Sequence, residues 1–301
     1  MALVWLPEDD WQQRLRVPPG LDVEVWRSGM SVPMSISDVE FYVPEYMGPG
    51  LVLDVLSEMS SLKVVQTLTA GVDDVLALRP DGVTLCNAAG VHDASTAELG
   101  VGLMIASLRG FSGFVRAQDA GTWLHARHDS LADRRVLLIG VGSVGSAIAR
   151  RLGSFEVDLT QVGRTARTGV HGIGEIADLL PEAEVVILAV PYGPSTHQLV
   201  DAEFLAALPE AALLVNVSRG AVVDTAALLA ELQSGRLRAA LDVTDPEPLP
   251  PDHPLWRAPN VLISPHVGGD TTAFLPRAWR LLQRQLDAFA VGRPLANVVA
   301  S

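Results

Sequence analysis

The stretch of sequence that decides the fold reads RVLLIGVGSVG and spans residues 135–145. An apolar run typical of a strand leads into Gly140, Gly142 and Gly145, and a helical pattern follows them. Gly140 permits a tight turn, Gly142 lets a ligand approach the backbone, and Gly145 lets the helix pack closely on the strand. A strand before and a helix after are the context in which this spacing binds the pyrophosphate of a dinucleotide. The alternative is a turn with a structural role only.

The start of the following helix is the second feature of this motif. The N–H groups of Ser143 and Val144 fall in its first turn, where they find no partner inside the helix. Free N–H groups and the positive end of the helix dipole together favour an anion. We therefore expect the pyrophosphate to lie beside Ser143 and Val144.

The next strand pattern bears on which dinucleotide binds. An NAD site needs a carboxylate at the tip of this strand, about 20 residues after the first glycine. Asp158 has a suitable spacing, but it opens the strand and so lies roughly 13–16 Å from the tip, at about 3.3 Å per residue. The tip continues into Arg164, Thr165 and Arg167, and guanidinium groups bind phosphate through paired charged hydrogen bonds. The sequence predicts NADP(H) over NAD(H), unless both arginines are merely solvated surface charges.

Strand and helix patterns alternate along most of the chain. The first third predicts a parallel sheet covered by helices, since short apolar strands alternate there with helical segments. Six strands with intervening helices follow, which is the content of a doubly wound dinucleotide-binding domain. The expected strands are 3–6, 23–26, 39–43, 62–68 and 83–86, then 135–139, 157–162, 185–190, 213–217, 239–243 and 261–264. Helices are expected at 51–59 and 72–78.

Two longer helical patterns decide how the domains are connected. One runs from about residue 94 to residue 116, and the other covers residues 271–291 near the end of the chain. We expect the last helix to return to the first domain. The predicted fold class is therefore α/β, with two doubly wound parallel-sheet domains. A Rossmann cofactor domain, residues 94–269, is inserted in a flavodoxin-like substrate domain, residues 1–93 and 270–301.

Length and charge limit the classes of partner. The chain has 301 residues, more than one ordinary core accommodates, and its formal net charge is −13. This charge argues against nucleic acid and anionic membranes as partners. The sequence contains no run of about 18 apolar residues, so no transmembrane helix is expected. The one cysteine, Cys86, permits no intrachain disulfide and fits a reducing compartment, so we expect a cytoplasmic protein.

Three further motifs follow later strands of the second domain. They read NVSRG at 216–220, LDVTDPEPL at 241–249 and SPHVGG at 264–269. Because each follows an apolar strand, each reaches the crevice outside the carboxyl ends of the sheet, where ligands bind in such folds. The chemically able side chains are Arg219, Glu247 and His266. Taken singly, each has an ordinary explanation, as a capping arginine, a loop charge or a structural histidine.

With these motifs in this order, the chain resembles the D-isomer-specific 2-hydroxyacid dehydrogenase family, which includes glyoxylate and hydroxypyruvate reductases. The resemblance also takes in TAGVD at 69–73 and NAAGV at 87–91. It implies a hydride transfer to the carbonyl carbon of a 2-oxo acid and a proton transfer to its oxygen. It further implies His266 as proton donor, Glu247 as the carboxylate that orients it, and Arg219 as the cation that holds or polarises the substrate. The chemistry of these residue types supports the same roles.

The resemblance implies roles at further positions. The substrate carboxylate should bind the backbone at Ala70, Gly71 and Val72, together with Arg219 and His266. Asp242 should reach the nicotinamide amide, although a turn cap is the alternative. The remaining cofactor contacts implied are Val190, Pro191, Thr196, His266 and Gly268. No metal site is expected.

Three functions remain open from the sequence. The leading one is an NADP(H)-dependent oxidoreductase that interconverts a small 2-oxo acid and its D-2-hydroxy acid, with glyoxylate or hydroxypyruvate as the substrate. The first alternative is an NAD-dependent dehydrogenase of a bulkier 2-hydroxy acid. The second is a dinucleotide-sensing binding protein like the corepressors of this fold, which the intact Arg219, Glu247 and His266 set disfavours. The resemblance also implies a homodimer, with residues 116–131 as a candidate arm.

Overall fold

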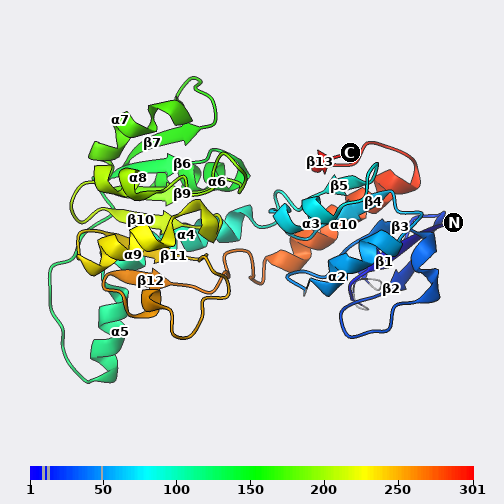
Figure 1. Cartoon of the computed structure of the whole chain (residues 1–301), viewed down its shortest axis with the longest axis horizontal. Coiled ribbons are helices and arrows are strands. Elements are labelled where there is room, and N and C mark those ends of the chain that lie inside the picture. Colours follow the sequence, from blue (N-terminus) through cyan, green and yellow to red (C-terminus); the bar gives the residue numbers. More distant parts are fainter. Residues whose placement is uncertain (9–10, 12–13, 49) are drawn as a thin grey trace. The chain divides into compact units, whose positions relative to one another are not determined.

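The computed structural model divides the chain into two compact units and describes residues 1–8, 11, 14–48 and 50–301. The first unit contains Met1–His92 and Thr272–Ser301, and the second contains Asp93–Thr271. Each unit has its own sheet with helices packed on it (Figure 1). The predicted fold class, α/β with two mainly parallel sheets, is confirmed.

The first unit is built on a six-stranded sheet in the order β13-β5-β4-β3-β1-β2. Five strands are parallel, and β13 pairs antiparallel with β5 at one edge. Without β13 the order 2-1-3-4-5 is that of flavodoxin. The strands are β1 (Ala2–Leu6), β2 (Leu21–Val25), β3 (Val39–Tyr42), β4 (Val64–Gln66), β5 (Thr84–Cys86) and β13 (Val298–Ala300).

Helices cover both faces of this sheet because successive side chains of a buried strand point in opposite directions. Val4 and Leu6 of β1 share a core with α10 (Phe274–Ala290). Leu3 and Trp5 belong to the core that includes residues of α2 (Leu51–Asp54) and α3 (Asp73–Leu78). Two short 3₁₀ turns, η1 (Met34–Asp38) and η2 (Val55–Glu58), complete the unit.

The second unit has a seven-stranded parallel sheet in the order β12-β11-β10-β9-β6-β7-β8. After β6, the strands β7 and β8 are added on one side of it, and the chain then crosses back to add β9 on the other side. Ligands of doubly wound sheets bind outside the carboxyl ends of the strands at such a reversal. The strands are β6 (Arg135–Ile139), β7 (Asp158–Gly163), β8 (His171–Gly172), β9 (Val185–Leu188), β10 (Leu213–Asn216), β11 (Arg238–Leu241) and β12 (Val261–Ile263).

Alternation along β6 again places a core on each face. Val136 and Leu138 pack with α4 (Asp93–Leu108) and α6 (Ser143–Leu152). Leu137 and Ile139 pack with α8 (Ala202–Ala207) and α9 (Thr225–Gln233). The other elements are α5 (Phe111–Asp119), α7 (Ile176–Leu179), η3 (Ile173–Glu175), η4 (Leu180–Glu182), η5 (Gly220–Val222) and η6 (Pro254–Arg257).

The prediction of a single long helix over residues 94–116 is wrong, because two helices occupy this stretch. Gly110 has a left-handed φ of 67° and separates α4 from α5, and the two helix axes are bent by 65°. A helix does not propagate through this backbone conformation, which glycine adopts without steric cost. The second sheet also has a seventh strand, β8, and the first has the antiparallel β13, and neither was expected.

Across the part of the chain that the structure describes, no single helix is long and apolar enough to cross a membrane, although the bent pair α4 and α5 together meet the length and composition required. The same residues include no group of three or more His, Cys, Asp or Glu side chains arranged to hold a metal ion.

Candidate active site

The glycine turn after β6 has the close approaches that its sequence requires. Gly140 has a φ of 105°, and a Cβ there would lie 2.3 Å from the carbonyl oxygen of Ala189. A Cβ on Gly145 would lie 1.9 Å from the carbonyl oxygen of Gly140. Only glycine fits either position, because real contacts at these distances do not occur. The turn therefore holds α6 directly against the end of β6.

Space and hydrogen-bond donors for an anion lie at the same turn. A Cβ on Gly142 would meet no atom within 4 Å, so the backbone there is open to a ligand. Among the described residues, the N–H groups of Ser143, Val144 and Gly145 have no acceptor. They stand at the N-terminus of α6, where the helix dipole also favours negative charge. The turn thus fits a pyrophosphate, as the sequence predicts.

The tip of β7 presents cationic side chains and no carboxylate. Arg164, Thr165 and Arg167 follow the strand and are exposed. Asp158 pairs in register with Arg135, at the opposite end of the strand from Gly163. The Asp158 carboxylate therefore lies at the end of β7 away from the crevice. The guanidinium groups of Arg164 and Arg167 follow the other end of the strand, which borders the crevice. This arrangement fits a phosphate on the ribose better than a free pair of ribose hydroxyls.

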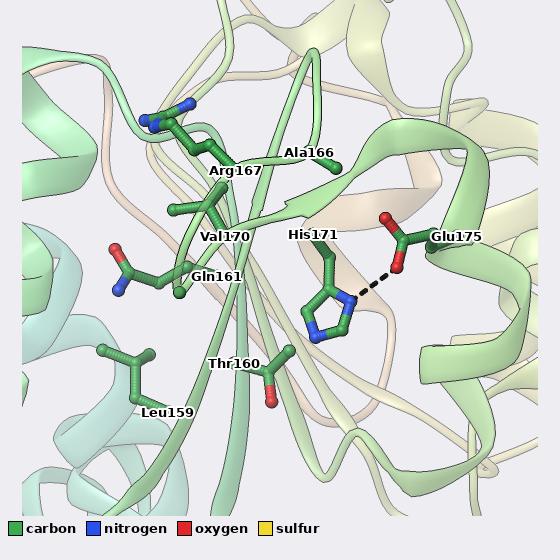
Figure 2. Close-up of a pocket in the computed structure, with 9 residues that line it drawn as sticks. Leu159, Thr160, Gln161, Ala166, Arg167, Val170, His171 and Glu175 are labelled. Carbon is green, nitrogen blue, oxygen red and sulfur yellow. Dashed lines mark hydrogen bonds and ion pairs between the residues drawn. The ribbon is translucent and has the colours of Figure 1, made fainter.

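A small hairpin orders this tip. Arg167 and Val170 exchange two backbone hydrogen bonds of 2.9 and 2.8 Å, and the Arg167 guanidinium lies against Gly163. Beside the hairpin is a cavity of about 350 Å³ that Thr160, Gln161 and Arg167 help to line. Figure 2 shows the Arg167 guanidinium pointing away from the His171–Glu175 ion pair, so it is available on the side of the strand tip.

The loop after β9 lies next to the glycine turn, because β9 pairs with β6. Val190 and Pro191 follow the strand, and the Thr196 hydroxyl donates a 2.7 Å hydrogen bond to the Pro191 carbonyl. Thr196 therefore holds the loop after β9 in place, beside β6, where the strand order of the sheet reverses. The position suits a cofactor contact by Val190 and Pro191, whereas the Thr196 hydroxyl hydrogen is already used.

The Arg219 segment is shaped by a buried asparagine at the end of β10. Asn216 is 1% exposed, and its side-chain oxygen accepts from the N–H and the hydroxyl of Ser218. Its side-chain N–H₂ donates to the Arg219 carbonyl at 2.9 Å. The Arg219 guanidinium donates to the Ser218 carbonyl, and its charge acts on Glu247. The sequence prediction did not include Asn216, although an Asn two residues before a Ser at a strand end is a signal for such a turn.

Glycine at position 220 lets the Arg219 and Glu247 segments cross. A Cβ on Gly220 would lie 1.9 Å from the carbonyl oxygen of Thr244. The backbone of the β10 loop is therefore packed directly against that of the β11 loop. Arg219 and Glu247 are brought together by this crossing.

His266 and Glu247 form the shortest polar contact of the site. His266 Nδ1 and Glu247 Oε1 are 2.5 Å apart, and both side chains are about one-third exposed, at 28% and 37%. Burial alone would raise the pKa of the Glu247 carboxyl. The hydrogen bond and charge of His266, the Thr244 N–H and the charge of Arg219 outweigh burial and lower that pKa. Glu247 is therefore held as a carboxylate that orients the imidazole. Within the described residues, His266 Nε2 has no partner and is free to meet a ligand.

Asp242 lies beneath the His266 loop. It is 3% exposed and accepts hydrogen bonds from the Ser264 hydroxyl, the Val267 N–H and the Gly268 N–H. The carboxylate expected to reach the nicotinamide amide is thus already engaged by three donors of its own chain. Ser264 was not expected to have a role of its own, because a serine after a strand carries no distinctive signal.

In the first unit, the loop after β4 presents backbone donors. The N–H groups of Ala70, Gly71 and Val72 find no acceptor among the residues with described coordinates. The loop is held from behind, since the Asn87 side chain donates to the Ala70 carbonyl and the Thr69 hydroxyl to the Gly71 carbonyl. Three N–H groups left open by a braced loop are suited to a carboxylate.

Comparison with known proteins identifies the family of this chain. A family model described as the NAD binding domain of D-isomer specific 2-hydroxyacid dehydrogenase matches residues 101–268. A glyoxylate reductase of Thermofilum pendens is 32% identical over 79% of this chain and 75% of its own length. A glyoxylate reductase/hydroxypyruvate reductase of Mus musculus is 34% identical over 70% of this chain and 69% of its own.

A solved structure is similar over almost the whole chain. It is a D-isomer specific 2-hydroxyacid dehydrogenase from Xanthobacter autotrophicus in complex with NADPH and MES. The TM-score is 0.84 at 32% identity, with 99% of this chain and 98% of that chain covered. Since the matched domain takes up more than half of the sequence and both relatives exceed 30% identity, the chain belongs to the D-isomer specific 2-hydroxyacid dehydrogenase family of oxidoreductases.

Proposed function

We propose that the protein is an NADP(H)-dependent reductase of a small 2-oxo acid, with glyoxylate or hydroxypyruvate as the substrate and a D-2-hydroxy acid as product where the product is chiral. The observation that carries this proposal is the 2.5 Å contact between His266 and Glu247, which leaves His266 Nε2 free at the carboxyl ends of the sheet. The two relatives with glyoxylate reductase names support the substrate class.

Asp93–Thr271 would act as the cofactor domain, and the other unit as the substrate domain. The turn at 140–145 would hold the pyrophosphate, while Arg164, Thr165 and Arg167 would hold the 2′-phosphate. Bound NADPH would supply the hydride. The NADPH seen in the related Xanthobacter structure supports this choice over NADH.

His266 would deliver the proton that the reaction needs. Its Nδ1 is bound to Glu247, so its Nε2 would donate to the substrate carbonyl oxygen as the hydride reaches the carbonyl carbon. Glu247 remains a carboxylate and stabilises the charged imidazole before the transfer. Arg219 would bind the substrate carboxylate or polarise the carbonyl as a fixed positive charge. The N–H groups of Ala70, Gly71 and Val72 would bind the same carboxylate.

A spectrophotometric panel tests the proposal. About a dozen 2-oxo acids are mixed with the protein and either NADPH or NADH, and loss of reduced cofactor is followed. Oxidation of NADPH by glyoxylate or hydroxypyruvate, at a higher kcat/KM than NADH, is expected. Faster reaction with NADH and a bulkier acid would instead assign the NAD-dependent alternative. Binding of the cofactor without any turnover would assign a dinucleotide sensor.

We also propose that two copies associate through residues 116–131 and α5. The described residues of α5 include no buried side chain. Phe111, Val115, Trp123 and Leu124 are all exposed by 46% or more. Apolar side chains gathered on one projecting segment favour a protein partner.

A further inference from the structure

Asp242 is unusual among the charged side chains because it is almost completely enclosed. It stands directly after β11 and is 3% exposed. A buried carboxylate is unfavourable unless its oxygens are hydrogen-bonded. Here Oδ1 accepts from the Ser264 hydroxyl at 2.6 Å and from the Val267 N–H at 3.0 Å, and Oδ2 accepts from the Gly268 N–H at 2.9 Å. All three donors lie within the segment that carries His266.

We propose that Asp242 is a positioning residue, whose carboxylate folds residues 264–268 into the turn that presents His266 to Glu247. This inference rests on the proposed function, in which His266 donates the proton. It gives Asp242 a role in the geometry of proton transfer, in place of the cofactor contact expected from the sequence.

The backbone of His266 shows what the carboxylate holds in place. His266 has a φ of 52°, in the left-handed region that a residue with a Cβ rarely adopts. The His266 N–H donates to the Asp242 carbonyl at 2.8 Å, so the same residue binds the turn through its main chain as well as its side chain. A strained turn persists only where its surroundings determine it. Asp242 accepts four hydrogen bonds from this turn, three at its carboxylate and one at its backbone carbonyl.

The remaining capacity of the carboxylate limits any other role. Two carboxylate oxygens accept about four hydrogen bonds, and three of these are used within the chain. One site, on Oδ2, is left for a ligand. A cofactor contact would therefore be a minor part of what Asp242 does.

Gly268 offers a way to disturb the same contact from the opposite side. A Cβ there would lie 2.8 Å from Asp242 Oδ2 and 3.4 Å from Thr96 Cγ2 at the start of α4. Gly268→Ala would therefore displace the carboxylate without changing its charge. Ser264→Ala would remove only the hydroxyl donor.

The experiment compares Asp242→Asn, Ser264→Ala and Gly268→Ala with the unaltered protein. Asp252→Asn is the matched control, since it makes the same chemical change at an exposed carboxylate of the same unit. Three quantities are measured: kcat with NADPH and the active 2-oxo acid, dissociation constants for NADPH and for 2′-phospho-ADP-ribose, and the low-field proton resonance of the His266–Glu247 hydrogen bond.

Asp242→Asn is expected to lower kcat by about 10²-fold, because a misplaced proton donor misses the near-attack geometry. It should also shift or abolish the low-field resonance and leave both dissociation constants within about twofold. Ser264→Ala and Gly268→Ala should move kcat and the resonance in the same direction. These two variants carry the test if Asp242→Asn does not fold.

Two results would overturn the inference. One is an unchanged kcat and resonance in all three variants. The other is a weaker dissociation constant for NADPH but not for 2′-phospho-ADP-ribose, which lacks nicotinamide, because this pattern assigns Asp242 to the cofactor. If the unaltered protein reduces no 2-oxo acid, the proposed function fails. The resonance and the two dissociation constants would still decide the role of Asp242.

Discussion

At the scale of single residues, the site depends on how opposite charges are brought together. Arg219, Glu247 and His266 come from three separate loops, and each loop is fixed by a buried polar residue or a close backbone crossing. The cation and the imidazole lower the pKa of the carboxyl despite its burial. His266 and Arg219 therefore both act on the Glu247 carboxylate.

Replacement of His266 is the most direct test of its proposed role as proton donor. His266→Ala should lower kcat by about 10²–10⁴-fold, the usual contribution of a positioned general acid. The dissociation constant for NADPH should change little, because the imidazole does not hold the phosphates. Near-normal turnover of this variant with an authenticated substrate would remove His266 from the mechanism.

The lowered pKa of Glu247 makes a prediction about stability and pH. In the folded protein this pKa lies below its value of 4.5 in an unfolded chain. A group of this kind stabilises the fold above its unfolded pKa, and the contribution disappears as pH falls through the folded pKa. Urea unfolding should therefore show Glu247→Gln to be less stable than the unaltered protein at neutral pH. The gap should close well below pH 4.5, and a gap that persisted unchanged there would contradict this origin of the shift.

The arginines after β7 decide the cofactor prediction. A hydrogen bond to a charged group contributes about 1.5–3 kcal/mol, so Arg164→Ala or Arg167→Ala should raise KM for NADPH by roughly 10–10²-fold. KM for NADH, which lacks the 2′-phosphate, should stay the same. Arg150→Ala, an exposed arginine at the end of α6, is the matched control. A preference of the unaltered protein for NADH, unchanged in Arg164→Ala, would exclude the NADP(H) assignment.

Residue types point to the proposed chemistry of the site, but not to the hydrogen bonds that hold its loops. Arg219, Glu247 and His266 are recognisable because each follows an apolar strand in a distinctive motif. Asn216 and Ser264 were not singled out, since their value lies in buried hydrogen bonds that depend on the folded loops. The geometry also changes the interpretation of Asp242, whose three intrachain donors no sequence pattern reveals.

At the scale of elements, the loops after β10 and β11 pack directly backbone against backbone, with no side chain between them at Gly220. Gly220→Ala would place a Cβ 1.9 Å from the Thr244 carbonyl oxygen. Overpacking of this kind costs about 1–3 kcal/mol, and here it also separates the loops that carry Arg219 and Glu247. We expect a lower free energy of unfolding and a loss of kcat together. Denaturant unfolding and steady-state kinetics measure the two effects.

Gly102 in α4 is the matched control for this prediction. A Cβ there would meet nothing within 4 Å, and the residue lies inside a helix. Gly102→Ala should raise the free energy of unfolding by about 0.5–1 kcal/mol through the entropy of the unfolded chain. Its kcat should not change. Equal destabilisation by both substitutions would show that the crossing at Gly220 has no special role.

The elements were predictable where local pattern and burial agree. The strands of both sheets are short apolar runs, and all eleven strands expected from the sequence lie close to their predicted positions. Most residues of these strands are buried, so an apolar run marks them well. The break at Gly110 depends on one backbone conformation, which a helical pattern does not show. The two residues of β8 are too few for any periodicity, and β13 depends on pairing with the distant β5.

At the scale of the whole molecule, the net charge of −13 opposes association of two identical chains. The candidate arm has features that offset this repulsion. Beside it lies a cavity of about 620 Å³, whose lining includes Arg116, Arg127 and Arg257, together with Arg238 in an ion pair with Asp129. Local positive charge and exposed apolar side chains therefore occur on the same part of the second unit, where Figure 1 shows α5 projecting from its sheet.

This coincidence predicts which surface holds a dimer together. Trp123 is 93% exposed on the arm, and burial of such a side chain against a second copy would contribute strongly to association. Trp123→Asp should convert the protein to a monomer in light scattering after size exclusion. Met34→Asp also replaces an exposed apolar side chain with aspartate, at a residue of the first unit that is 98% exposed. The mass measured for this variant should still be that of a dimer. A monomeric unaltered protein, or a dimer that survives Trp123→Asp and Val115→Asp together, would show that the arm is not the interface.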